Sequence, residues 1–175
     1  ILAGLSATPT VLHGLLRSRD TDLMIAALES LGVVVEQESA SATTVRVVPP
    51  ASGRFAGDVS VFCGLAGTVM RFVPGLALFA EGPVHFSGDA QASERPMKPV
   101  LDGLEQLGAV VSYEGEVGRL PFTVTPPSSD VLRAGTTARR VSIDSSGSSQ
   151  FISGLLLIGS RLPGGLALRH TGEKL

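Results

Sequence analysis

The residues best suited to chemistry lie in a glycine-rich segment, residues 64–71, which joins two glycines to a hydroxyl and an arginine. Gly67, Thr68 and Arg71 follow an apolar strand predicted over residues 59–62 and open a long apolar helix. The N-terminus of a helix carries roughly half a positive charge, and glycine lets a ligand approach the backbone closely. The segment therefore suits an anion, although an ordinary tight turn before a helix has the same composition.

A second segment, residues 144–151, is the most polar short run and precedes the most apolar helix. Its serines, among them Ser148 and Ser149, and Gln150 supply hydroxyl and N–H donors without bulk. Such donors suit a phosphate group or a ring that carries hydroxyls. A flexible loop in which one serine caps the helix would look similar.

A third candidate is Arg95, which stands between Glu94 and a proline predicted to begin a helix. A guanidinium there could bind a carboxylate or phosphate with two parallel hydrogen bonds. A surface ion pair with Glu94 or Asp102 is the competing interpretation, and an ion pair is equally open for Arg71. No pair of carboxylates and no Ser/His/Asp set suggests general acid–base catalysis. Anion binding is the chemistry that these residues offer.

Composition narrows the function classes. The 175 residues are 43% hydrophobic and 17% charged, with a formal net charge of −2, which is typical of a folded domain. Lysine and arginine are scattered, so we expect no nucleic-acid partner. No apolar run reaches the roughly 18 residues needed to span a bilayer, so we expect no membrane segment. Cys63 is the single cysteine and the three histidines are dispersed, so we expect no disulfide and no metal site.

The elements that position these segments form a repeat. Residues 28–35 resemble residues 104–111, about 76 positions later, and each copy is followed by a second strand and a double proline. A glycine–hydroxyl start, an apolar helix and a strand recur in the same way at residues 67–87 and 147–170. The spacing is too long for a solenoid of 20–50-residue repeats. It predicts an internally pseudo-symmetric α/β (α+β) domain of βαβαββ units, with helices packed inside and sheets outside.

Several boundaries follow from local signals. We expect one helix over residues 67–79, another over residues 21–31 with Asp20 as its N-cap, and a strand over residues 10–16.

Together, residues 63–71, 94–97 and 144–151 resemble the 5-enolpyruvylshikimate-3-phosphate synthase family, and Ser18, Arg19 and Asp20 are similar to its early segment. The resemblance covers nearly the whole chain in order. It implies the enolpyruvyltransferase fold, an inside-out barrel with two domains of three βαβαββ units each. Residues 1–175 would be a single domain, most of the N-terminal domain, without its first strand and without the C-terminal domain.

The resemblance also implies an activity: transfer of the enolpyruvyl group of phosphoenolpyruvate to the 5-hydroxyl of shikimate 3-phosphate, with release of phosphate. It implies no cofactor, a cytoplasmic monomer, and a role in chorismate and aromatic amino acid biosynthesis. Because the family's acid–base residues lie in the C-terminal domain, we expect this chain alone to be inactive. The implied site residues are Ser148, Ser149 and Gln150 for shikimate 3-phosphate; Gly67, Arg95 and Gln150 for phosphoenolpyruvate; and Thr68 and Arg71 in support.

Two alternative functions are compatible with a repeated fold of this kind. The related enolpyruvyltransferase that acts on UDP-N-acetylglucosamine usually has a reactive cysteine five residues before the arginine, where this chain has Ala90. A non-catalytic module that binds phosphorylated metabolites could use the same repeated fold. Leu65 departs from the asparagine of many family members and removes one possible side-chain contact.

Overall fold

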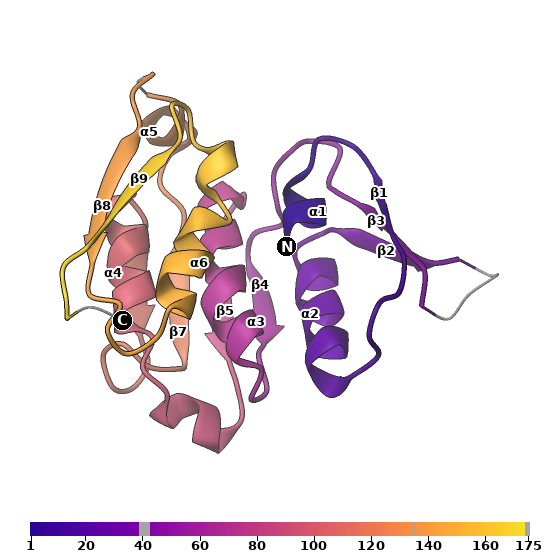
Figure 1. Ribbon diagram of the computed structural model, residues 1–175, viewed down its shortest axis with the longest axis horizontal. Coiled ribbons are helices and arrows are strands. Elements are labelled where there is room, and N and C mark those ends of the chain that lie inside the picture. The colour runs from indigo at the N-terminus through magenta and orange to yellow at the C-terminus, as the bar shows by residue number, and fades with distance from the viewer. Residues whose placement is uncertain (39–42, 135, 174–175) are drawn as a thin grey trace.

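The computed structural model describes residues 1–38, 43–134 and 136–173. Within these ranges the strands form sheets of three, four and two strands, and the helices lie among them (Figure 1). None of the helices described there is long and apolar enough to cross a membrane. The predicted α/β fold is confirmed.

The four-stranded sheet comes from the middle of the chain. Its unit comprises β4 (Val59–Phe62), α3 (Gly67–Phe72), the 3₁₀ helix η1 (Val73–Phe79), β5 (Val84–Ser87), the 3₁₀ helix η2 (Ala90–Glu94), α4 (Lys98–Gln106), β6 (Val110–Tyr113) and β7 (Phe122–Thr125). β4 and β5 pair in parallel, as the α3 crossover requires, and the β6–β7 hairpin extends the sheet antiparallel in the order β4-β5-β7-β6. This is the predicted βαβαββ unit.

The flanking segments reproduce parts of this unit. Before it lie α1 (Leu2–Leu5), β1 (Thr10–Leu12), α2 (Arg19–Ser30), β2 (Val34–Gln37) and β3 (Val45–Val48). After it lie α5 (Ser129–Arg133), β8 (Arg139–Ile143), α6 (Gln150–Leu156), the 3₁₀ helix η3 (Gly159–Arg161) and β9 (Leu166–His170). The first sheet has the order β1-β3-β2, and β8 pairs with β9 in parallel. By order and direction, β1, β2 and β3 correspond to β5, β6 and β7, whereas β8 and β9 correspond to β4 and β5.

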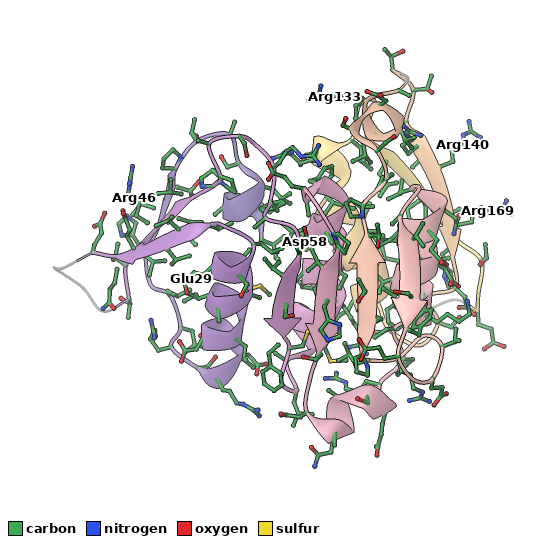
Figure 2. All side chains as sticks on the ribbon, turned by 180° about the vertical axis from the view of Figure 1, so that it is seen from behind. Glu29, Arg46, Asp58, Arg133, Arg140 and Arg169 are labelled. Carbon is green, nitrogen blue, oxygen red and sulfur yellow. The ribbon has the colours of Figure 1, made fainter. Side chains whose placement is uncertain are left out.

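The helices pack against one another inside, and the sheets cover them. α6 contacts α3 and α4, and α3 also contacts α2. Figure 2, the view from behind, shows the four-stranded sheet as an outer layer, with Arg140 and Arg169 projecting from the β8–β9 side. A Cβ on Gly154 of α6 would lie 2.2 Å from the carbonyl oxygen of Arg71 in α3. The two helices whose starts hold the candidate residues are therefore in backbone contact.

Two predicted elements are shorter than expected. The helix predicted over residues 67–79 is α-helical only to Phe72 and continues as 3₁₀ helix, because Pro74 has no N–H for the α-helical ladder. All seven residues of η1 are buried. The apolar pattern therefore predicted their burial correctly but predicted an α-helix where the structure has a 3₁₀ helix. The strand predicted over residues 10–16 ends at Leu12.

Two predicted helix starts were also misplaced. α2 is capped by Ser18, not Asp20: the Ser18 hydroxyl accepts the backbone N–H of Thr21 at 3.3 Å in a capping box. α4 begins at Lys98, beyond the expected proline, so Arg95 lies in the connection from η2 rather than at the helix start.

Candidate functional site

The turn between β4 and α3 is held by its own backbone. Gly64 has a positive φ of 54°, a conformation that favours glycine. The N–H of Cys63 donates to the carbonyl of Ser87 in β5 at 2.7 Å, and the N–H of Ala66 donates back to the carbonyl of Cys63 at 3.0 Å. These bonds place Gly67 and the half-buried Thr68 in the first turn of α3.

Arg95 lies directly over this turn. Its Nη1 donates to the carbonyl of Leu65 at 2.9 Å. A Cβ built on Gly67 would be 2.9 Å from Arg95 Nη2 and 3.2 Å from Arg95 Nη1. The absence of a side chain at Gly67 is what lets the guanidinium come this close to the backbone. The predicted proximity of Gly67 and Arg95 is present in the structure.

Arg71 approaches Gly67 from inside the protein. Only 6% of this residue is exposed, and its Nη1 would be 3.3 Å from a Cβ on Gly67. Nη1 donates to Oε1 of Gln150 at 2.7 Å, and the guanidinium carbon lies 5.2 Å from the ring centroid of Phe151. Nε of Arg71 is buried without a hydrogen-bond partner. Burial, and secondarily the charge of Arg95, lowers the pKa of Arg71.

No acidic side chain in the described part of the protein forms an ion pair with either guanidinium. None of the ion pairs found among the described residues includes Arg71 or Arg95, and Asp102, one expected partner of Arg95, binds Lys98 at 2.7 Å instead. The predicted alternative of structural ion pairs is therefore wrong for both arginines in the described part of the chain. The positive charges of Arg71 and Arg95 lie close to Gly67, and no described carboxylate pairs with them. An anion that binds at this position would therefore be stabilised by both guanidiniums.

The turn between β8 and α6 brings the serines to the same helix cluster. The N–H of Ser148 donates to the carbonyl of Ser145 at 3.1 Å, and the Ser148 hydroxyl accepts the N–H of Gln150 at 3.3 Å. Ser148 is half-buried and Ser149 is exposed. Gln150 opens α6 and accepts a hydrogen bond from Arg71 in α3, so this side-chain contact joins the two turns. Both turns lie at the lower end of the molecule in Figure 1.

The described residues offer no cluster of three or more histidine, cysteine or acidic side chains that could hold a metal ion. The donors that are present are guanidinium, amide, hydroxyl and backbone N–H groups, which hydrogen-bond to phosphate and carboxylate oxygens. The arrangement can bind and orient a multiply charged anion.

A sequence model of a protein family, EPSP synthase (3-phosphoshikimate 1-carboxyvinyltransferase), matches residues 1–174. The chain belongs to the EPSP synthase family. A 3-phosphoshikimate 1-carboxyvinyltransferase from Bifidobacterium longum (strain DJO10A) is 72% identical over 99% of this chain. One from Mycobacterium ulcerans (strain Agy99) is 44% identical over 100% of it. The chain spans 38% of the length of each of these EPSP synthase relatives.

Two solved EPSP synthase structures from Acinetobacter baumannii share the fold, each with a TM-score of 0.75. They are 21% and 22% identical to this chain, cover 99% of it, and are themselves covered to 37% and 38%. At this identity the match is evidence for the EPSP synthase fold of the chain.

The structure brings the two predicted segments of this EPSP synthase family member together through Arg71 and Gln150, but sequence reasoning missed two contacts. From the residues alone it left a structural ion pair open for Arg71, whereas the side chain is buried and binds Gln150. It also treated His170 as one of three scattered histidines, whereas its Nδ1 lies 2.7 Å from Oγ of Ser145 in the second turn. The alternation along β9 holds a signal for the second contact, because it puts His170 on the same side of the strand as Leu166 and Leu168.

Proposed function

We propose that this chain forms part of the substrate site of a 3-phosphoshikimate 1-carboxyvinyltransferase. The enzyme would transfer the enolpyruvyl group of phosphoenolpyruvate to the 5-hydroxyl of shikimate 3-phosphate and release phosphate. The observation that carries the proposal is the convergence of Arg71 and Arg95 on Gly67, where neither arginine forms an ion pair with a described carboxylate. Membership of the EPSP synthase family and the names of the relatives support it.

The roles divide between the two turns. Gly67, through its backbone N–H, and Arg95, through its guanidinium, would bind phosphoenolpyruvate. Ser148 and Ser149 would bind shikimate 3-phosphate, and Gln150 would contact both ligands because it stands between the turns.

Two further residues would support this site. Arg71 would hold Gln150 in place and add positive potential from behind Gly67. Thr68 would shape the phosphoenolpyruvate pocket from the same side.

The rest of the enzyme would come from a longer polypeptide. This chain spans 38% of the length of each of the two relatives. Its described residues present anion-binding groups rather than an acid–base pair. We propose that it is most of an N-terminal domain, that it binds without turnover when isolated, and that a C-terminal domain completes the cleft. A cytoplasmic, monomeric enzyme of chorismate biosynthesis is the corresponding whole protein.

The test measures phosphate release by the full-length polypeptide that carries this sequence, supplied with phosphoenolpyruvate and shikimate 3-phosphate. Release that needs both substrates supports the proposal, and no release from the folded protein would refute it. The double substitution Ser148→Ala/Ser149→Ala should weaken shikimate 3-phosphate binding by about 10- to 100-fold, since each lost hydrogen bond to a charged group is worth roughly 1.5 kcal/mol or more. The exposed Ser160→Ala is the matched control and should bind normally.

Calorimetry with shikimate 3-phosphate on the same two variants isolates the serine assignment. Equal heats for the double variant and Ser160→Ala would overturn the roles of Ser148 and Ser149 while leaving the enzymatic proposal to the phosphate assay.

A further inference from the structure

His170 is a polar residue on the more buried side of β9, and the same side of β5 is apolar. In the middle unit Val61 of β4 pairs with Phe86 of β5, and in the last unit Ile143 of β8 pairs with His170 of β9. Phe86 is fully buried and stacks on a ring of the adjacent strand with centroids 5.3 Å apart. A histidine at this place keeps a ring but adds two nitrogens that need hydrogen-bond partners.

Both nitrogens of His170 have partners, and the partners define the protonation state. Nδ1 lies 2.7 Å from Oγ and 3.3 Å from the backbone N of Ser145, a residue with no exposed surface. Because that backbone N–H can only donate, Nδ1 accepts. Nε2 lies 2.6 Å from the carbonyl oxygen of Glu173 and therefore carries the proton. The ring is held as the neutral Nε2–H tautomer.

Ser145 transmits this contact to the predicted substrate residues. Its carbonyl accepts the N–H of Ser148, whose hydroxyl accepts the N–H of Gln150. The hydrogen bonds therefore run without a break from His170 to the start of α6, where Gln150 binds Arg71.

The chain after β9 closes over the same turn. The carbonyl oxygen of Glu173 accepts from His170 and lies 3.3 Å from the Ser146 hydroxyl, which donates its proton to Asp144 at 2.6 Å. Gly172 lies so close that a Cβ would be 2.0 Å from Oδ1 of Asp144 and 2.1 Å from Oγ of Ser146. The end of β9 thus packs against the second turn, and His170 contributes the side-chain hydrogen bonds of this contact.

We propose that His170 is a positioning residue for shikimate 3-phosphate: it holds Ser148 and Gln150 in their binding geometry through Ser145, with Nδ1 as the acceptor. The inference rests on the proposed function, since it assigns to His170 the preorganisation of that substrate turn. If the turn between β8 and α6 were free to rearrange, ordering it around the ligand would cost part of the binding free energy.

Two substitutions separate positioning from simple packing. His170→Phe keeps a ring, as in the middle unit, but removes the acceptor. His170→Asn loses the ring but places an amide oxygen where Nδ1 stood. In the full-length polypeptide we expect His170→Phe to raise the KM for shikimate 3-phosphate about 10-fold with kcat within about threefold, and His170→Asn to restore KM to within about threefold of the parent.

His85→Phe is the matched control, because His85 is a partly buried histidine on the equivalent strand whose Nδ1 contacts Thr123 and Glu114, away from the turn. It should leave the KM unchanged. The reverse order, with Phe tolerated and Asn impaired, would show that His170 only packs and would overturn the proposal. Unchanged KM in both variants would overturn it as well.

A second readout needs neither turnover nor ligand. In the ligand-free protein, the backbone amide resonances of Ser146, Ser148 and Gln150 should shift in His170→Phe and return toward the parent in His170→Asn. If His170→Phe does not fold, the nearly isosteric Ser145→Ala should shift the same amides. Unshifted amides would refute the positioning role even if the full-length polypeptide released phosphate, and absent phosphate release with shifted amides would refute only the enzymatic proposal.

Discussion

Two strand-to-helix turns occupy equivalent places in the fold and are stabilised in opposite ways. The turn from β4 to α3 is held by main-chain bonds, from Cys63 N–H to the Ser87 carbonyl and from Asp89 N–H to the Gly64 carbonyl. The turn from β8 to α6 has a main-chain bond, from Ser148 N–H to the Ser145 carbonyl, and is otherwise held by side chains. There Asp144 Oδ1 accepts from both the N–H and the hydroxyl of Ser146 at 2.9 and 2.6 Å.

The same contrast holds at the buried position of each turn. Cys63 and Ser145 both have no exposed surface. Cys63 is an apolar filler, and burial raises the pKa of its thiol to about 12. Ser145 instead uses its hydroxyl and N–H on His170. The strand pattern that buries both turns is shared, so the fold does not require the polar version. The difference lies in the groups that each turn offers to a ligand.

The comparison predicts where each turn is vulnerable. A turn held by its backbone tolerates side-chain changes except where glycine is needed for close approach. A turn held by side chains tolerates an added Cβ but fails when a hydroxyl or acceptor is removed. Arg71 belongs to both, because it lies behind Gly67 and binds Gln150.

The largest effect is expected from Arg71→Leu, which removes the link between the turns. We expect affinity for phosphoenolpyruvate to fall by about 100-fold, in line with the roughly 2–5 kcal/mol that buried charge contacts contribute to binding. The free energy of unfolding should not decrease, because leucine also removes a buried Nε without a partner and the repulsion from Arg95. Binding calorimetry and urea unfolding of the full-length polypeptide measure the two quantities.

Arg54→Leu is the matched control for this prediction. Arg54 donates to the carbonyl of Ala80 at 2.6 Å, away from both turns, so its loss should lower stability and leave affinity unchanged. If Arg71→Leu bound phosphoenolpyruvate with normal affinity, Arg71 would not link the two turns functionally, and this prediction would be refuted.

A smaller effect is expected from adding one methyl group to each turn. In Gly67→Ala the new Cβ would lie 2.9 to 3.3 Å from nitrogens of Arg95 and Arg71, so the guanidiniums must retreat from the anion position. We expect about 10-fold weaker phosphoenolpyruvate binding. In Gly147→Ala the nearest atom, Cε2 of Phe151, is 3.7 Å away and binding should change less than about twofold. Equal effects at the two glycines would refute the contrast between the turns.

Sequence reasoning succeeded where the signal is local and repeated. Glycine before a helix, serine at a helix start and the apolar period each depend on neighbouring residues, so the turns and the α/β units were predictable. The residues alone left the role of Arg71 open, since a guanidinium one turn into a helix looks the same whether it meets a carboxylate or Gln150 on another helix. Sequence reasoning failed at the cap of α2, because Ser18 and Asp20 are both good N-caps and only the path of the preceding chain selects Ser18.

The smallest expected effect is a difference between the two turns in how their stability depends on pH. The thiol pKa of Cys63 is raised from about 9.0 to about 12, so its contribution to stability is complete below the ordinary thiol pKa and is lost as pH rises toward 12. Hydrogen bonds from the hydroxyl and the backbone N–H of Ser146 lower the pKa of Asp144. The contribution of Asp144 is therefore complete above the ordinary carboxyl pKa near 3.8 and is lost as pH falls through the lowered value.

The two turns should consequently open at opposite ends of the pH range. Amide resonances of Ala66 should move in alkali and those of Ser146 in acid. Asp144→Asn should remove the acid change alone, and Cys63→Ala the alkaline change alone, because each substitution removes one ionising group and leaves the other turn intact. A single pH transition shared by both amides would mean that the turns open together, and that backbone and side-chain support do not divide them.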